Sequence, residues 1–66
     1  MTKLEFKDVL EEKHMTLKEL SEKTDISIVE LSFIKKGKKK PRLPNVHKIA
    51  DALGLTYEET FDMFYL

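Results

Sequence analysis

Cysteine is absent from this chain of 66 residues, which also contains only two glycines and two prolines. Without cysteine, neither a disulfide framework nor a thiolate metal site can support the fold. No apolar run approaches the roughly 20 residues that span a bilayer, and the first residues lack the apolar stretch of a signal peptide. We therefore expect a single cytoplasmic domain over residues 1–66, with no membrane partner. Its core should bury only about 60% of the surface of the unfolded chain.

Acidic and basic residues are equal in number, twelve each, but they are separated along the chain. Residues 35–50 contain seven bases and no acid, whereas residues 51–66 contain four acids and no base. One edge of the domain should therefore be positive. A lysine-rich segment of this kind is compatible with a solvated loop and also with binding to nucleic-acid phosphates.

Four helix starts are indicated by a Ser or Thr followed three residues later by Glu, the pattern of the capping box. In this arrangement the hydroxyl accepts a hydrogen bond from the third helical amide, and the carboxylate accepts one from the amide of the capping residue. The four pairs are Thr2 with Glu5, Thr16 with Glu19, Ser27 with Glu30 and Thr56 with Glu59.

A fifth helix is indicated by apolar residues at helical spacing between Pro44, tolerated in a first turn, and Gly54, a helix stop. The sequence thus predicts an all-α, compact five-helix domain with no room for strands. The expected helices are residues 3–14, 17–24, 28–36, 44–53 and 57–65. The expected core positions, at intervals of three and four residues, are Phe6, Val9, Leu10, Leu20, Leu31, Ile34, Val46, Ile49, Leu53, Phe61 and Phe64.

A tight corner joins the second and third predicted helices. Asp25 tolerates the backbone conformation of a turn, Ile26 can fill the corner, and Ser27 can cap the helix that follows. This is the geometry of a helix-turn-helix, in which the second helix, residues 28–36, is offered to the major groove of DNA.

The segment "MTLKELSEKTDISIVELSFIKKGKKKPRLPNVHKIADALGLTYEETF", residues 15–61, resembles the five-helix Cro and lambda-repressor type of helix-turn-helix domain, the XRE family. The resemblance extends beyond the corner to "KKGKKKP" and "KIADALGLTYEETF", which are similar to the loop and fourth helix of that family. It implies a regulator that binds double-stranded DNA, commonly as a homodimer and here as a repressor that occupies a promoter. The third helix would contact bases and the glycine loop behind it would hold phosphate.

Carried over by this resemblance, the base-contacting positions are Ile28, Val29, Glu30 and Phe33. The implied phosphate contacts are Thr16, Leu17, Lys36, Lys38, Lys39, Lys40 and Arg42, and Ser27, a cap first, is a further candidate. The chain departs from the family here, because many members have glutamine at the positions of Leu17 and Ile28. The amide and guanidinium groups that form paired hydrogen bonds with bases are therefore missing from this helix.

The third predicted helix has a second apolar face. Val29 and Phe33 lie about 150° around the helix from Leu31 and Ile34, which point into the core. Three explanations of this face remain open. It packs on thymine methyl groups, while DNA shape and lysine–phosphate contacts supply the rest of the binding, or it binds a protein partner, in which case the chain is an antirepressor or inhibitor. In the third, a neighbouring segment such as the N-terminus covers it.

Two further assignments have alternatives. Glu30 could accept a hydrogen bond from cytosine, but its place in a capping box explains it without DNA. At the C-terminal end, Met63, Tyr65 and Leu66 are candidates for a symmetric contact between two chains, or they simply cover the small core.

Nothing in the sequence indicates an enzyme. No nucleophile–base set or glycine-rich phosphate loop is visible, and the lone His14 and His47 lack the neighbours of a metal site. We therefore expect no catalytic residues, no metal, no cofactor and no small-molecule substrate.

Overall fold

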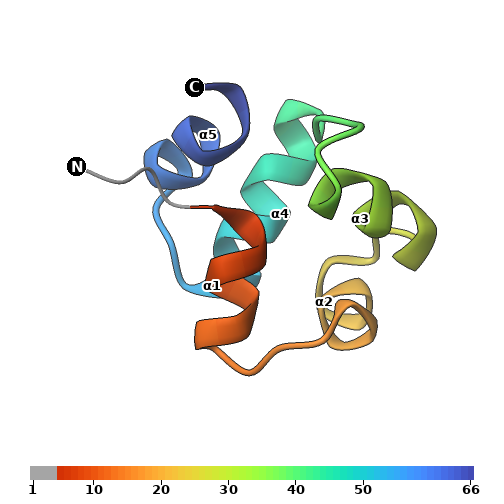
Figure 1. Ribbon diagram of the computed structural model, residues 1–66. Helices are drawn as coiled ribbons and strands as arrows, with labels where there is room; N and C mark the ends of the chain where they lie inside the picture. The colour runs from red at the N-terminus through yellow and green to blue at the C-terminus, as the bar shows by residue number, and fades with distance from the viewer. Residues whose placement is uncertain (1–4) are drawn as a thin grey trace.

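The computed structural model describes residues 5–66, which contain five helices and no strand. The helices are α1 (Phe6–Glu12), α2 (Leu17–Thr24), α3 (Ile28–Lys35), α4 (Leu43–Leu53) and α5 (Tyr57–Tyr65). Helix α4 packs against both α2 and α5, and α2 packs against α3 (Figure 1). The predicted all-α fold with a helix-turn-helix is confirmed.

The predicted helix bounds hold for α2 and α5 and shift slightly elsewhere. Helix α3 ends at Lys35, with Lys36 as its capping residue, and α4 begins one residue early, at Leu43. Helix α1 differs most, because Glu5 has an extended backbone, with φ −114° and ψ 143°, and is the residue before the helix. The predicted start at residue 3 is therefore wrong. The expected capping residue Thr2 lies outside the described residues.

Two of the predicted capping boxes form completely. The hydroxyl of Thr16 accepts from the Glu19 amide at 3.1 Å, and the hydroxyl of Thr56 accepts from the Glu59 amide at 3.0 Å. The Thr56 amide, and then its hydroxyl, donate to Glu59 and hold the pKa of that carboxyl below its ordinary value of 4.5. Because this folded-state pKa is lowered, Glu59 contributes to stability above about pH 4.5. The contribution is lost as the pH falls through the lowered pKa.

The core contains the apolar residues predicted from α1 to α4, but α5 is rotated relative to the prediction. Its fully or nearly fully buried residues are Thr60 (0% exposed) and Met63 (7%), whereas Phe61 and Phe64 are only half-buried. Thr60 is tolerated in the core because its hydroxyl donates to the carbonyl of Thr56 at 2.9 Å. The assignment of Met63 to a contact between chains is therefore corrected, since this side chain packs inside one chain.

The corner between α2 and α3 has the predicted construction. Asp25 adopts the left-handed conformation, with φ 61°, and the Ile26 side chain is buried. The Ser21 hydroxyl on α2 donates to the carbonyl of Ile26 and ties the corner to the first helix. These contacts determine how α3 is presented on the surface.

Candidate nucleic-acid interface

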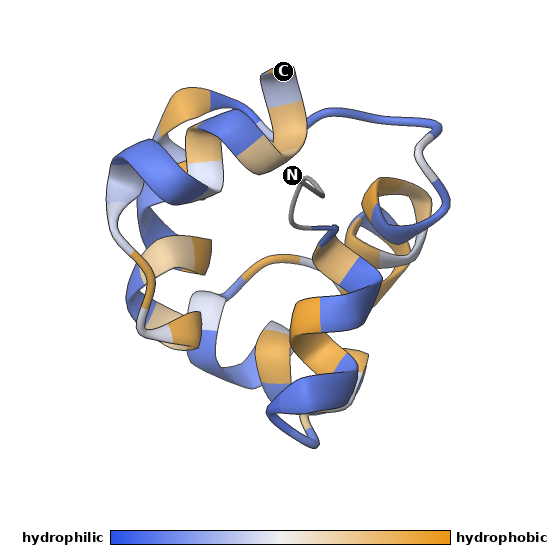
Figure 2. Ribbon diagram, turned by 60° about the vertical axis from the view of Figure 1, so that its left-hand side comes forward, coloured by the Kyte–Doolittle hydropathy of each residue, from blue (hydrophilic) through white to orange (hydrophobic). Residues whose placement is uncertain are grey.

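Helix α3 has one buried face and one exposed apolar face. Leu31 is 0% exposed and Ile34 is 4% exposed, whereas Ile28, Val29 and Phe33 are 45%, 60% and 45% exposed. The predicted division of the helix into two faces is confirmed. Residues 5–66 therefore leave this second face open to solvent. Figure 2 colours much of α3 as hydrophobic, since both of its faces carry apolar residues.

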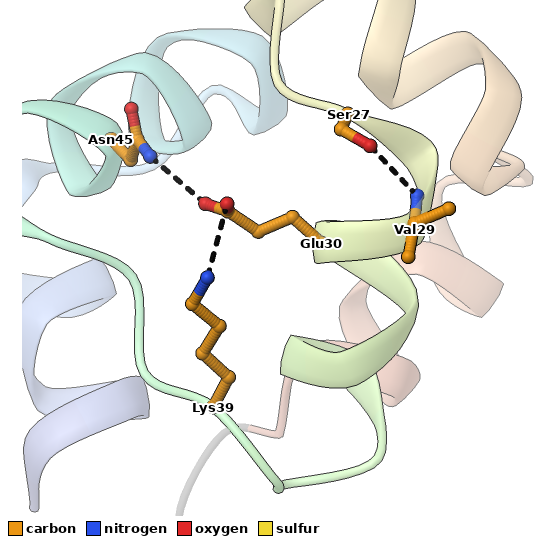
Figure 3. A network of polar contacts seen from close by, with 5 residues as sticks. All are labelled: Ser27, Val29, Glu30, Lys39 and Asn45. Atoms are coloured by element: carbon orange, nitrogen blue, oxygen red, sulfur yellow. Dashed lines mark hydrogen bonds and ion pairs between the residues drawn. The ribbon is translucent and has the colours of Figure 1, made fainter.

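Glu30 contacts residues outside its own helix. Its carboxylate is 3.2 Å from the amine of Lys39 and accepts a hydrogen bond from the side-chain amide of Asn45, also at 3.2 Å. Figure 3 shows Glu30 extending away from Val29, toward the start of α4. The charged end of Glu30 thus has partners within the chain, Lys39 and Asn45, and its assignment to the base-contacting face stays a prediction.

The capping box predicted at Ser27 is consequently wrong. The hydroxyl of Ser27 does cap α3, but it accepts from the amide of Val29 at 3.2 Å (Figure 3), and Glu30 does not complete the reciprocal bond. The Glu30 carboxylate instead meets two donors at once, the amine of Lys39 and the side-chain amide of Asn45, and Lys39 also brings an opposite charge.

Three residues at the starts of α2 and α3 were predicted to contact phosphate, and each also forms contacts within the chain. The Thr16 hydroxyl forms hydrogen bonds with the amide and the carboxylate of Glu19. Leu17 is half-buried and packs against the core. Ser27 is exposed and its oxygen accepts from the Val29 amide, so the hydroxyl remains free to donate one hydrogen bond.

The loop between α3 and α4 carries the positive charge. Gly37 has φ 78°, a conformation that disfavours any other residue, and the Lys38 amide donates to the carbonyl of Phe33 at 3.0 Å. The loop therefore starts as a closed turn on the end of α3. Figure 2 shows most of it as hydrophilic. Every basic side chain of this loop is exposed: Lys36, Lys38, Lys39, Lys40 and Arg42.

The far end of the loop is held by α5. Pro41 is fully buried, and its carbonyl accepts a hydrogen bond from the hydroxyl of Tyr65. The amine of Lys40 lies 5.4 Å from the centre of the same ring, which stacks on Phe61 at 4.7 Å. No sequence pattern indicated this anchor. Of the residues predicted for contact between chains, Tyr65 is thus used within the chain, and Leu66 is 78% exposed.

Replacing Tyr65 by phenylalanine should lower the free energy of unfolding by about 1 kcal/mol, the usual net value of one hydrogen bond. The ring and its stacking remain, so only the bond to the Pro41 carbonyl is lost. Urea unfolding measures the change. Tyr57→Phe is the matched control, because the Tyr57 hydroxyl bonds to no group within residues 5–66. Equal losses in the two variants would contradict the anchor.

Other kinds of site have little support in the described part of the chain. No three His, Cys, Asp or Glu side chains among residues 5–66 are grouped to hold a metal ion. None of the helices in this range has the length and apolarity required to cross a membrane. Leu43, at the first position of α4, is a further apolar residue that is half-exposed, and no pattern in the sequence predicted its exposure.

A family model described as helix-turn-helix matches residues 6–59. No curated protein and no solved structure matches the chain. The matched segment includes the corner, the exposed face of α3 and the whole basic loop. It covers most of the chain, so this protein belongs to the XRE-type helix-turn-helix family, a family of DNA-binding transcription regulators.

Proposed function

We propose that this chain is a transcriptional repressor that binds double-stranded DNA in a sequence-specific manner. Helix α3 enters the major groove with Ile28, Val29 and Phe33 toward the base edges, and the basic loop that follows contacts backbone phosphates. The observation that carries the proposal is the position of this loop, which begins at the C-terminal end of the exposed apolar helix. The apolar surface is suited to the base edges in the groove, and the positive charge beside it is suited to the phosphates that flank the groove.

The charges of the loop are largely free for phosphate. Residues 35–42 contain six bases, and among residues 5–66 only Glu30 forms an ion pair with any of them, through Lys39. The carbonyls at the end of α3 also favour cations there and help to hold the side chains near the helix end. Each lysine that neutralises a phosphate releases counterions and contributes affinity that depends on salt but not on sequence.

Sequence preference must come from apolar contact and from DNA shape. The exposed side chains of Ile28, Val29 and Phe33 have no hydrogen-bonding group to offer a base. Apolar side chains contact the methyl group of thymine in the major groove, and sequence-dependent deformability supplies additional discrimination. We therefore expect sites rich in thymine at the contacted positions.

We further propose that the protein binds as a homodimer, with the exposed Leu66 end contributing to the contact between chains. The target would then contain two inverted half-sites about one DNA turn apart, roughly 34 Å, so that both α3 helices face one side of the duplex. Sedimentation should show a dimer on such DNA. A monomer at high concentration, with and without DNA, would contradict this part of the proposal.

A protein-binding module is the second candidate function. The face formed by Ile28, Val29 and Phe33 combines aliphatic and aromatic groups at 45–60% exposure, which is also typical of interface anchors. In that case the domain would act as an antirepressor or inhibitor. The basic loop favours DNA, because a protein anchor alone does not require a cluster of six bases.

Fluorescence anisotropy with a labelled duplex of mixed sequence tests DNA binding directly. Affinity should fall steeply between about 50 and 200 mM salt, with a log–log slope of about −5 per protomer if all six bases contact phosphate. This is an upper bound on the magnitude. Absence of binding at the low-salt end, or an affinity insensitive to salt, would contradict the proposed role of the loop.

Replacing Glu30 by glutamine should increase affinity for duplex DNA roughly tenfold at about 0.1 M salt and add about 0.9 to the magnitude of the salt slope. The substitution removes a negative charge and releases Lys39, while a glutamine oxygen can still accept from Asn45. Glu22→Gln is the matched control, an exposed glutamate on α2 with the same change in charge. If Glu30 instead accepted a hydrogen bond from cytosine, the variant would bind its preferred sites more weakly.

A further inference from the structure

The exposed face of α3 offers very little hydrogen-bonding chemistry. Its large side chains, Ile28, Val29 and Phe33, are apolar, and the carboxylate of Glu30 is held by Lys39 and Asn45. The nearby hydroxyls belong to serines, which bond to either donors or acceptors on bases and therefore discriminate little among them. Specific contact by Ile28, Val29 and Phe33 must rest on an apolar feature of the base pair.

The major groove contains one apolar feature of this kind. Each base pair presents a pattern of hydrogen-bond donors and acceptors in this groove. Thymine adds its C5-methyl group, the only apolar group that the four bases present there. Cytosine methylated at C5 carries the same methyl group at the same ring position. An apolar side chain that contacts only the methyl group forms no hydrogen bond with the base. It therefore cannot distinguish thymine from 5-methylcytosine by their donors and acceptors.

We propose that α3 recognises the C5-methyl group itself, so that 5-methylcytosine replaces thymine in its binding sites and cytosine methylation strengthens binding. This inference rests on the proposed DNA binding and specifies its ligand. Val29 and Phe33 are four residues apart, one helical turn or about 6 Å along the axis, which corresponds to roughly two base-pair steps. The two side chains can therefore contact methyl groups on base pairs about two steps apart.

The size of the effect follows from the burial of a methyl group. About 0.8 kcal/mol per buried methyl corresponds to a change in affinity of about fourfold, and two methyl groups give about fifteenfold. Phosphate contacts by the loop are unaffected by base methylation. The ratio of affinities for methylated and unmethylated duplexes should therefore change little with salt, although both affinities fall.

Four alternating duplexes of equal length and equal charge test the proposal. The first pair is A·T and A·U, which differ only in the methyl group, and the second pair is G·C and G·5-methylcytosine. Anisotropy titrations at one low salt concentration give the four affinities. We expect A·T to bind about fifteenfold more tightly than A·U, and methylated G·C to exceed unmethylated G·C by a similar factor. In the Val29→Ala, Phe33→Ala double variant both ratios should approach one.

Each alternative result has a distinct meaning. Equal binding to A·T and A·U would overturn the inference while leaving DNA binding by the basic loop intact. A preference for A·T over A·U without a preference for methylated G·C would overturn the equivalence of the two methyl sources. Ratios unchanged in the double variant would remove the assignment to α3. Failure of all four duplexes to bind would overturn the proposed function and this inference together.

Discussion

Replacing Lys36, Lys38 and Arg42 together by glutamine should lower duplex affinity by roughly 500-fold at about 0.1 M salt. The three side chains are exposed and form no ion pair within residues 5–66, so nothing in this part of the chain competes with phosphate for them. Each lost phosphate contact removes about 0.9 from the salt slope, or about 2.7 for three. Anisotropy titrations over a series of salt concentrations measure both quantities.

The matched control removes the same charge outside the loop. Lys13, Lys23 and Lys48 are also exposed, and their replacement by glutamine changes the net charge by the same amount. A small decrease is expected from the altered overall field, with little change in slope. If this control lost as much affinity and slope as the loop variant, binding would depend on net charge and not on the position of the loop.

Leu31→Ala should lower the free energy of unfolding by about 2–5 kcal/mol, because it creates a cavity in the centre of the core. Leu31 is 0% exposed and lies on the buried face of α3. A domain of this size has a total stability of only about 3–10 kcal/mol, so the variant should be largely unfolded or strongly destabilised at room temperature. Urea or thermal unfolding followed by circular dichroism measures the loss.

Val29→Ala on the same helix is the control for this core substitution. Val29 is 60% exposed, so its truncation should change stability by no more than about 0.5 kcal/mol. Alanine also has the higher helix propensity, which offsets part of any lost contact. Similar destabilisation by both substitutions would show that α3 does not have one buried and one exposed face.

The helices and the two faces of α3 follow from local sequence signals. Residues that cap a helix bond to amides only three positions away, so Thr16 and Thr56 could be identified from the sequence alone. The division between Leu31 and Val29 depends only on the angle between successive residues of a helix. Both kinds of signal are independent of how distant segments pack.

Contacts between distant segments could not be predicted in the same way. Glu30 fits the capping pattern, but the tertiary fold brings Lys39 and Asn45 to it, nine and fifteen residues away. The bond between Tyr65 and the Pro41 carbonyl spans 24 residues. The buried face of α5 was not predicted because it includes the polar residue Thr60. Its hydroxyl is satisfied by a hydrogen bond to the Thr56 carbonyl, which allows the side chain to be buried.

Selection of bound fragments from a random duplex pool, with the wild type and the Val29→Ala, Phe33→Ala double variant at one salt concentration, tests the central claim most directly. We expect the wild type to enrich a motif with thymine at the contacted positions. The double variant should retain loop-driven binding but lose about 1–3 kcal/mol of discrimination at those base pairs. Enrichment of the same motif to the same degree by both proteins would contradict the assignment of base recognition to the exposed face of α3.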